Sequence, residues 1–167
     1  DLQFSYSQPY VNVVKEKIEP RQSSQSILQL GYQFPCQYGD KDYFALIVFN
    51  AMFGEFAHSA LFTTLREKEG LAYSISSQFD IFTGLLEVYA GIEKSNRNQA
   101  MRGISRELNY IKLGRFSSSL LNQTKKIIRM NALLSEDHAL TLVEQRFNKV
   151  IFGDKSLSLE NWLDEIE

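Results

Sequence analysis

The order of the predicted elements indicates an α+β fold, with a mainly antiparallel sheet and helices packed on one of its faces. Apolar residues recur at every second position in some stretches and at every third or fourth position in others, which separates strands from helices. The elements follow the order strand, two helices, two strands, three helices, with a short fourth helix at the end. This segregation favours an antiparallel sheet, because a parallel sheet needs strands and helices that alternate.

The N-terminal stretch is predicted to differ from the rest of the chain. Residues 1–22 are expected to be a linker, and residues 23–167 the α+β domain. Within the linker, alternation around Val11 and Val13 is compatible with an edge strand over Tyr10–Ile18. The chain starts with Asp and stops within an amphipathic pattern, so we expect it to be a fragment of a longer protein.

The first predicted strand and helix follow this stretch. The strand covers Ile27–Phe34 and places alternate side chains on one face, those of Leu28, Leu30, Tyr32 and Phe34. Asp40 is a suitable N-cap for a helix over Lys41–Phe53. In the second half of this helix Asn50 is nearly the only polar residue. A helix that is apolar almost all round is buried on several sides, at the centre of the domain or against a partner domain.

The next predicted helix runs from about Ala57 to a charged last turn and stops at Gly70, which fits a left-handed C-cap. From Tyr73 the apolar period changes to two, which indicates a strand. Arg66 therefore lies at the end of a helix and Tyr73 at the start of the following strand. A tight reversal would direct both side chains to one place.

The second half of the chain contains a hairpin and then helices. The hairpin turns at Phe82–Gly84 and returns as a strand over Leu85–Ile92. Helical spacing and capping residues predict four further helices: one from Ser95 or Asn96 to Gly114, one over about Ser118–Leu134, one from a cap at Ser135 to Gly153, and a short one from Ser158 through Trp162.

Composition excludes several classes of protein. The net charge of −2 leaves no basic field for nucleic acid or anionic lipid. No apolar run reaches the roughly 18 residues of a membrane span. The single cysteine, Cys36, allows no internal disulfide and no cysteine-built zinc site. It fits a reducing compartment, so we expect a cytoplasmic location and no membrane or nucleic-acid partner.

The segment from Arg66 to Ser77, Arg-Glu-Lys-Glu-Gly-Leu-Ala-Tyr-Ser-Ile-Ser-Ser, preceded by Ser59-Ala60-Leu61-Phe62, resembles the signature of the insulinase/pitrilysin family of zinc metallopeptidases. The resemblance is to the second, non-catalytic domain of a homologous pair with the fold of the mitochondrial processing peptidases. It is strongest to bacterial members that lack the zinc motif. Upstream of Ser59 the family often has a glycine-rich turn, which this chain replaces with Gly54-Glu55-Phe56-Ala57-His58.

The resemblance implies roles for Arg66 and Tyr73. In the family, the arginine and tyrosine at these positions hold the substrate backbone and support the tetrahedral intermediate at the zinc of the other half. His58 and Ser59 are minor candidates for contacts near the substrate. The alternative is structural: Arg66 would pair with Glu69 or with helix carbonyls, and the ring of Tyr73 would be buried in the hairpin.

Metal chemistry in the family rests on His-x-x-Glu-His, where two histidines on one helical face bind zinc and the glutamate is the general base. This motif is absent, because the only histidines are His58 and His138. No serine lies in a Gly-x-Ser-x-Gly elbow, and Cys36 has no neighbouring histidine. We therefore expect no metal, no cofactor and no catalytic residue in this domain, with zinc only in a partner, if anywhere.

These observations predict a non-catalytic domain of a peptidase or peptidase-like protein. It would form part of a closed chamber, bind extended peptide, and associate with a homologous half that does or does not carry zinc. One alternative is a degenerate subunit with a purely structural or interaction role. A second is a free-standing enzyme with an unrecognised site, against which the shortage of histidine and cysteine argues.

Overall fold

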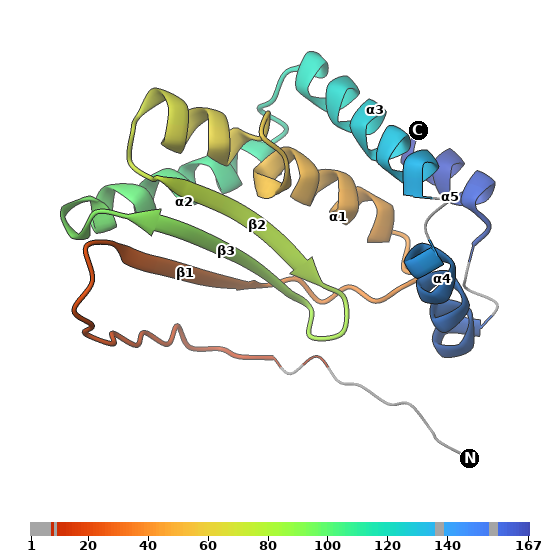
Figure 1. Cartoon of the computed structure of the whole chain (residues 1–167), viewed down its shortest axis with the longest axis horizontal. Helices are drawn as coiled ribbons and strands as arrows, with labels where there is room; N and C mark the ends of the chain where they lie inside the picture. Colours follow the sequence, from red (N-terminus) through yellow and green to blue (C-terminus); the bar gives the residue numbers. More distant parts are fainter. Residues whose placement is uncertain (1–7, 9, 136–138, 154–156) are drawn as a thin grey trace.

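The computed structural model describes residues 8, 10–135, 139–153 and 157–167. Within these residues, three strands form one antiparallel sheet in the order β1-β3-β2: β1 (Ser26–Gln33), β2 (Ser74–Asp80) and β3 (Leu85–Ile92). The helices lie on one side of this sheet (Figure 1). The predicted α+β class is confirmed, because the predicted hairpin and the predicted first strand share a sheet that helices cover on one face.

Helical elements occupy most of the remaining chain. They are α1 (Tyr43–Asn50), the π-helical turns η1 (Ala51–Glu55) and η2 (Phe62–Lys68), the 3-10 turn η3 (Lys94–Asn96), and the helices α2 (Arg97–Lys112), α3 (Ser118–Ser135), α4 (Ala139–Phe152) and α5 (Leu159–Ile166). For the helices after β3, the predicted ends are close to those observed. Ser158 caps α5 as predicted, since its Oγ accepts a hydrogen bond from the Asn161 backbone N–H. The predicted cap at Ser135 involves residues 136–138, which lie outside the described residues.

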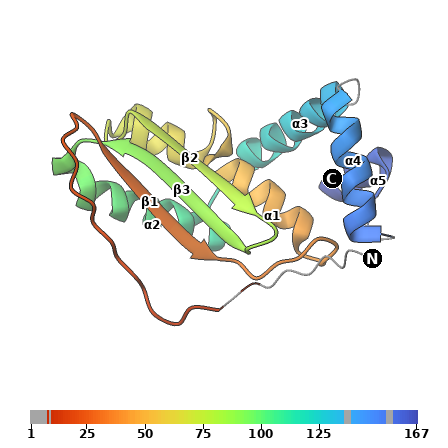
Figure 2. The ribbon, with the colours of Figure 1, turned by 60° about the horizontal axis from the view of Figure 1, so that its bottom comes forward.

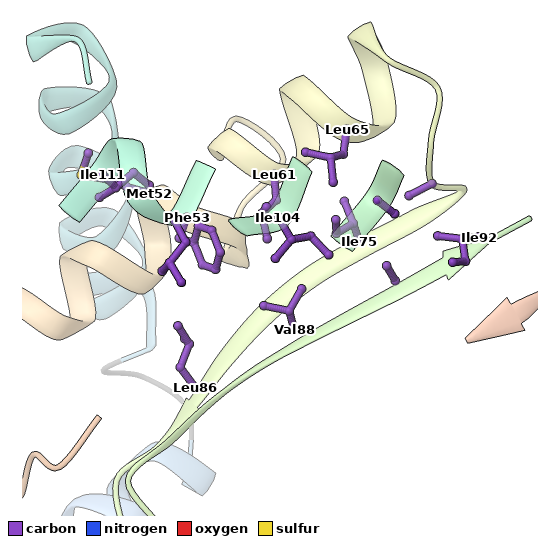
Figure 3. Packing of buried hydrophobic residues seen from close by; sticks show 14 residues of the cluster. Met52, Phe53, Leu61, Leu65, Ile75, Leu86, Val88, Ile92, Ile104 and Ile111 are labelled. Carbon is purple, nitrogen blue, oxygen red and sulfur yellow. The ribbon is translucent and has the colours of Figure 1, made fainter. Parts of the chain in front are cut away.

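The main core lies between the sheet and the helices (Figure 3). The alternation of β3 sends one set of side chains inward, and these are fully or almost fully buried: Leu86, Val88, Ala90 and Ile92. They face apolar side chains from η1, η2 and α2, including Phe53, Leu65 and Ile104, and from Leu61, which directly precedes η2. Burial of each such side chain stabilises the fold by roughly 1.5–3 kcal/mol.

The other face of the sheet is polar. Gln29 of β1 donates from Nε2 to Glu87 Oε1 (3.2 Å) and to the hydroxyl of Tyr89 (2.8 Å), both on β3. Gln78 of β2 donates from Nε2 to Glu87 Oε2 (3.0 Å). These cross-strand pairs occupy the side of the sheet away from the helices, which explains why only one face is covered.

Helix α1 is buried on two sides, as its apolar sequence predicts. On one side Phe49 contacts Phe34 and Phe53, next to the sheet. On the other side a second apolar cluster joins Phe44 to Trp162 of α5 and includes Ile128 of α3. The helix therefore lies between the sheet and α3 and α5, at the centre of the domain, which is the first of the two interpretations of its pattern.

Two helix starts differ from the prediction. Asp40 does not cap α1, because its carboxylate accepts a hydrogen bond from the Gln37 backbone N–H and closes a turn, and the helix begins only at Tyr43. The next helix begins near Ala60 instead of Ala57, because residues 56–59 form a turn. Local hydrogen bonding by the side chains of Asp40 and Ser59 competes with helix formation at these two helix starts.

The edge strand compatible with Tyr10–Ile18 does not form. This segment is exposed and pairs with no strand, and it runs past the sheet as an extended chain (Figure 2). Val11 donates its backbone N–H to the side chain of Gln33, and Glu16 forms an ion pair with Arg97. The alternating valines have no apolar surface to cover, because the open face of the sheet is polar.

Gly54 lies where η1 presses against β2, and a side chain there would collide with the sheet. An added Cβ would lie 2.8 Å from the Ser77 backbone nitrogen and 2.6 Å from its Oγ. We expect Gly54→Ala to lower the free energy of unfolding by about 1–3 kcal/mol, the usual cost of overpacking. Denaturant melts measure this change.

Gly31→Ala is the matched control, since nothing lies within 4 Å of its added Cβ. That substitution is expected to be neutral or slightly stabilising, because alanine loses less backbone entropy than glycine on folding. Equal stability of the two variants would show that η1 does not lie against β2 as described.

Candidate functional site

The reversal between η2 and β2 fixes the positions of Arg66 and Tyr73. Gly70 has φ of +60°, the left-handed conformation predicted for the C-cap. Backbone bonds close the turn, from Leu71 N–H to Leu65 C=O (2.8 Å) and from Tyr73 N–H to Gly91 C=O (2.8 Å). Because Leu65 is fully buried, the reversal is anchored in the core and its polar side chains start from defined places.

Arg66 is exposed and lies over an aromatic ring of its own helix. Its guanidinium carbon is 4.5 Å from the centre of the Phe62 ring, a cation–π contact. No ion pair with Glu69 and no hydrogen bond to a helix carbonyl is found for Arg66 in the described residues, so the alternative pairing is wrong. The Glu69 carboxylate instead accepts a hydrogen bond from Arg106 Nη2 (2.6 Å). Stacking leaves most of the guanidinium donors of Arg66 directed to solvent.

Tyr73 is also outside the core, with 51% of its surface exposed. The alternative in which its ring is buried in the hairpin is therefore wrong, and Ala72 and Ile75 fill that place instead. The Tyr73 hydroxyl donates to Glu93 Oε1 (2.6 Å). This hydrogen bond to a carboxylate raises the pKa of Tyr73, so the phenol is a neutral donor at physiological pH.

Sequence reasoning missed Glu93, the partner of Tyr73. The hairpin register pairs Ser74 with Gly91, and one further step places Tyr73 opposite Ile92, next to Glu93. The position of the turn at Phe82–Gly84 could have located this neighbour from the sequence, since turn length sets hairpin register.

The two minor candidates lie further inside. His58 Nε2 forms a hydrogen bond with the hydroxyl of Thr124 on α3 (2.9 Å), and its ring stacks on Phe56. Ser59 is fully buried, and its Oγ lies 3.5 Å from the Phe62 backbone N–H at the start of the helix. Their observed contacts join the turn to α3 and begin the helix, and a role near substrate stays a prediction.

The surface hollows in the described part of the chain include two that bear on the site. One, of about 310 Å³, lies between the η2–β2 reversal and α2 and is lined by Glu69, Leu71, Gln99, Arg102, Gly103 and Arg106. The other, of about 800 Å³, lies among α1, α3, α4 and α5. Arg66 and Tyr73 line neither of these two hollows. Whether they meet at one ligand therefore stays a prediction.

Comparison with known proteins identifies the family. Residues 3–128 match the family described as the peptidase M16 inactive domain. The chain belongs to this family. The chain is 39% identical over 153 residues to YmfF of Bacillus subtilis, described as a probable inactive metalloprotease, covering 92% of this chain and 36% of YmfF. It thus spans about a third of that relative.

Solved structures agree with this assignment. A conserved protein from Enterococcus faecalis V583 superposes with a TM-score of 0.92 at 42% identity, over 96% of this chain and 38% of that one. The inactive peptidase domain of a putative zinc protease from Bordetella parapertussis shares the fold, with a TM-score of 0.73 at 15% identity, over 87% of this chain and 80% of that one. The resemblance to the non-catalytic peptidase domain is confirmed.

The described residues of this M16 domain do not form a zinc site. In the described part of the chain, no three histidine, cysteine or acidic side chains gather in a metal-binding group. His58 is bound to Thr124, and His138 lies outside the described residues. Cys36 is a buried free thiol, and burial raises its pKa, which disfavours the thiolate that binds metals. None of the helices described is long and apolar enough to cross a membrane.

The burial of His58 predicts a pH dependence of stability. Desolvation lowers its pKa in the folded state, so the unfolded chain binds more protons as the pH falls through about 6.5. The free energy of unfolding should therefore decrease on acidification from pH 7 toward pH 5. Denaturant melts across this range measure the slope.

His58→Gln tests the assignment, because the amide can keep the bond to Thr124 but does not titrate. The variant should have a smaller slope than the wild type between pH 7 and pH 5. An identical slope in both proteins would mean that His58 is equally easy to protonate in the folded and unfolded states.

Proposed function

We propose that this domain is the non-catalytic part of an M16 peptidase-like protein, in which it forms part of a chamber wall and holds extended peptide. The peptide would lie against Arg66 and Tyr73. The proposal includes a cytoplasmic location, which the single cysteine supports. It also includes a homologous peptidase half as partner, whether that half carries zinc or not.

The observation that carries the proposal is the placement of both side chains outside the core, on a reversal that is itself anchored in the core. An exposed arginine and tyrosine at an anchored turn can contact a ligand without a change in the fold. A guanidinium offers several donors in a fixed plane, which suits the backbone carbonyls of an extended peptide. The tyrosine adds a neutral hydroxyl donor.

The intradomain contacts of the same two residues favour the second candidate function, a purely structural subunit. The Tyr73 hydroxyl is already bound to Glu93, and Arg66 already lies on Phe62. A peptide carbonyl would have to take the place of the Glu93 carboxylate at the hydroxyl. In a structural subunit these contacts would serve only to hold the reversal.

The first prediction concerns zinc. Because the His-x-x-Glu-His ligand set is missing from the sequence, the purified chain is expected to hold no stoichiometric zinc and to cleave no peptide. Elemental analysis and a peptide-cleavage assay measure this. One tightly bound zinc per chain, lost on His58→Ala or His138→Ala, would contradict the prediction.

The second prediction separates the two candidate functions. With a zinc-bearing partner half, Arg66→Ala and Tyr73→Phe should each lower the cleavage rate by on the order of a hundredfold, since each removes a donor to the transition state. Arg66→Ala should change the free energy of unfolding by no more than about 0.5 kcal/mol, as is usual for exposed positions. Tyr73→Phe should leave the melting temperature nearly unchanged.

Lys68→Ala and Tyr110→Phe are matched controls, because both side chains are exposed and neither residue is one of the two candidates, Arg66 and Tyr73. Neither should alter the rate. A purely structural role predicts lower melting temperatures for Arg66→Ala and Tyr73→Phe and no specific kinetic defect. With a zinc-less partner, peptide affinity replaces the rate, and unchanged affinity in both variants would refute the proposal.

A further inference from the structure

Helix α4 has an apolar face that the domain leaves uncovered. Val143, Phe147 and Val150 recur at intervals of four and three residues, the spacing of one helical face, and Leu142 lies beside them. Their exposed fractions are 62%, 57%, 83% and, for Leu142, 50%. Below, these four residues are called the α4 apolar face. Monomeric proteins seldom expose a contiguous group of large apolar side chains of this kind.

The comparison with α2 shows how unusual this is within the same molecule. Helix α2 has a similar stripe at helical spacing, and there the stripe is turned inward and buried: Ala100, Ile104, Leu108 and Ile111. In α4 the apolar stripe instead faces away from the domain. Its polar residues Gln145, Arg146, Asn148 and Lys149 line the hollow of about 800 Å³ that separates it from α1, α3 and α5.

The C-terminal end of α4 contacts the rest of the domain through aromatic rings. Phe152, its last residue, stacks on Tyr38 at 4.3 Å between ring centres, with an angle of 16° between the planes. It also stacks on Phe82 at the tip of the hairpin, at 6.0 Å. These contacts hold the C-terminal end of the helix against the loop before α1 and the β2–β3 turn. The α4 apolar face is therefore exposed while the C-terminal end of the same helix is in contact with the domain.

We propose that the α4 apolar face is the surface on which the homologous peptidase-like half docks. This inference rests on the proposed function in taking that half as the partner, and it adds the surface. Figures 1 and 2 place α4 at one end of the molecule, where a neighbouring domain can approach it. Docking would remove the four apolar side chains from water, which favours association.

The size of the surface favours a neighbouring half over a second copy of this chain. Complexes of separate molecules bury roughly 800 Å² per partner, and four side chains supply only part of that area. A domain in the same polypeptide needs less, because tethering raises its effective concentration to the millimolar range. In the Enterococcus faecalis protein and in YmfF, the part that matches this chain is 38% and 36% of the whole, so in both relatives the domain occurs beside further chain.

The charges beside the face argue against a membrane as the occupant. Helices that lie on membranes carry a polar side rich in lysine and arginine. Helix α4 carries Glu144 along with Arg146 and Lys149, and the chain has a net charge of −2. A mixed set of charges suits the polar rim of a protein interface.

Hydrogen exchange tests the proposal on the protein that contains both halves. The backbone amides of α4 should exchange about tenfold or more slowly there than in this chain alone, because docking opposes local opening of the helix. The double variant Val143→Gln, Phe147→Gln should return them to the rate seen in this chain alone. Glutamine keeps the helical propensity, so the folded domain should survive.

Two controls keep the result interpretable. Ile27→Gln changes an apolar side chain that is 82% exposed on β1, away from α4, and should leave the exchange of α4 unaltered. Circular dichroism checks that the double variant is folded, and Val150→Gln alone is the milder replacement if it is not. Equal α4 exchange with and without the other half would overturn the proposal, as would protection that survives the double variant.

Three further outcomes would also overturn it. One is a dimer of this chain in light scattering that Phe147→Gln dissociates, which would assign the face to a second copy. Another is sedimentation with anionic vesicles that the same variant abolishes, and the third is a protein in which no second peptidase-like half exists. Failure here leaves the proposed function separately testable, because loss of peptide cleavage on Arg66→Ala does not depend on α4.

Discussion

The contact between the end of α1 and strand β2 is the constraint on which the rest of the domain depends. The Ser77 hydroxyl donates to Asn50 Oδ1 (2.8 Å), and Asn50 in turn donates from Nδ2 to Glu55 Oε2 (2.9 Å). Asn50 and Ser77 are both buried, so an unpaired polar group at either would be costly. The glycine between them in space, Gly54, lets the helix backbone reach the sheet.

This contact bears on the segment that follows, from η1 to β2. With η1 held on β2, the turn over residues 56–59 and the helix η2 must lie above the same strand, and the reversal at Gly70 must return the chain to the sheet edge. Arg66 and Tyr73 are thereby placed at the rim of the helical layer. Both side chains are exposed there.

Much of the fold follows from patterns of local origin. The strands at Ile27–Phe34 and Leu85–Ile92 were recognisable because every second residue is apolar, and the helices after Asn96 because their caps and stripes agree. The helix starts predicted at Asp40 and Ala57 were wrong, because a side-chain hydrogen bond to a nearby backbone group can substitute for a helical turn. The edge strand compatible with the alternating valines before Ile18 does not form, because alternation does not reveal whether the strand has an apolar surface to cover.

The candidate site was foreseeable only in part. The positions of Arg66 and Tyr73 relative to helix end and strand start could be inferred from Gly70 and the change of period. Hairpin register could have located Glu93, but the contacts actually made could not be inferred. Whether Tyr73 bonds to Glu93 or enters the core, and whether Arg66 lies on Phe62 or pairs with Glu69, depends on tertiary geometry. The exposed face of α4 could not be predicted either, because an amphipathic pattern does not show which side of the helix packs against the protein.

The π-helical turns have a consequence for how this region tolerates changes in chain length. A π turn holds one residue more than an α turn, so the segment Phe62–Lys68 has an ordinary α-helical arrangement available if one residue is deleted. Strand β2 cannot accommodate the deletion of one residue in this way, because the shift would turn every later side chain to the opposite face. Insertions and deletions between Ser59 and Asp80 should therefore have accumulated in the helix, while the strand kept its length.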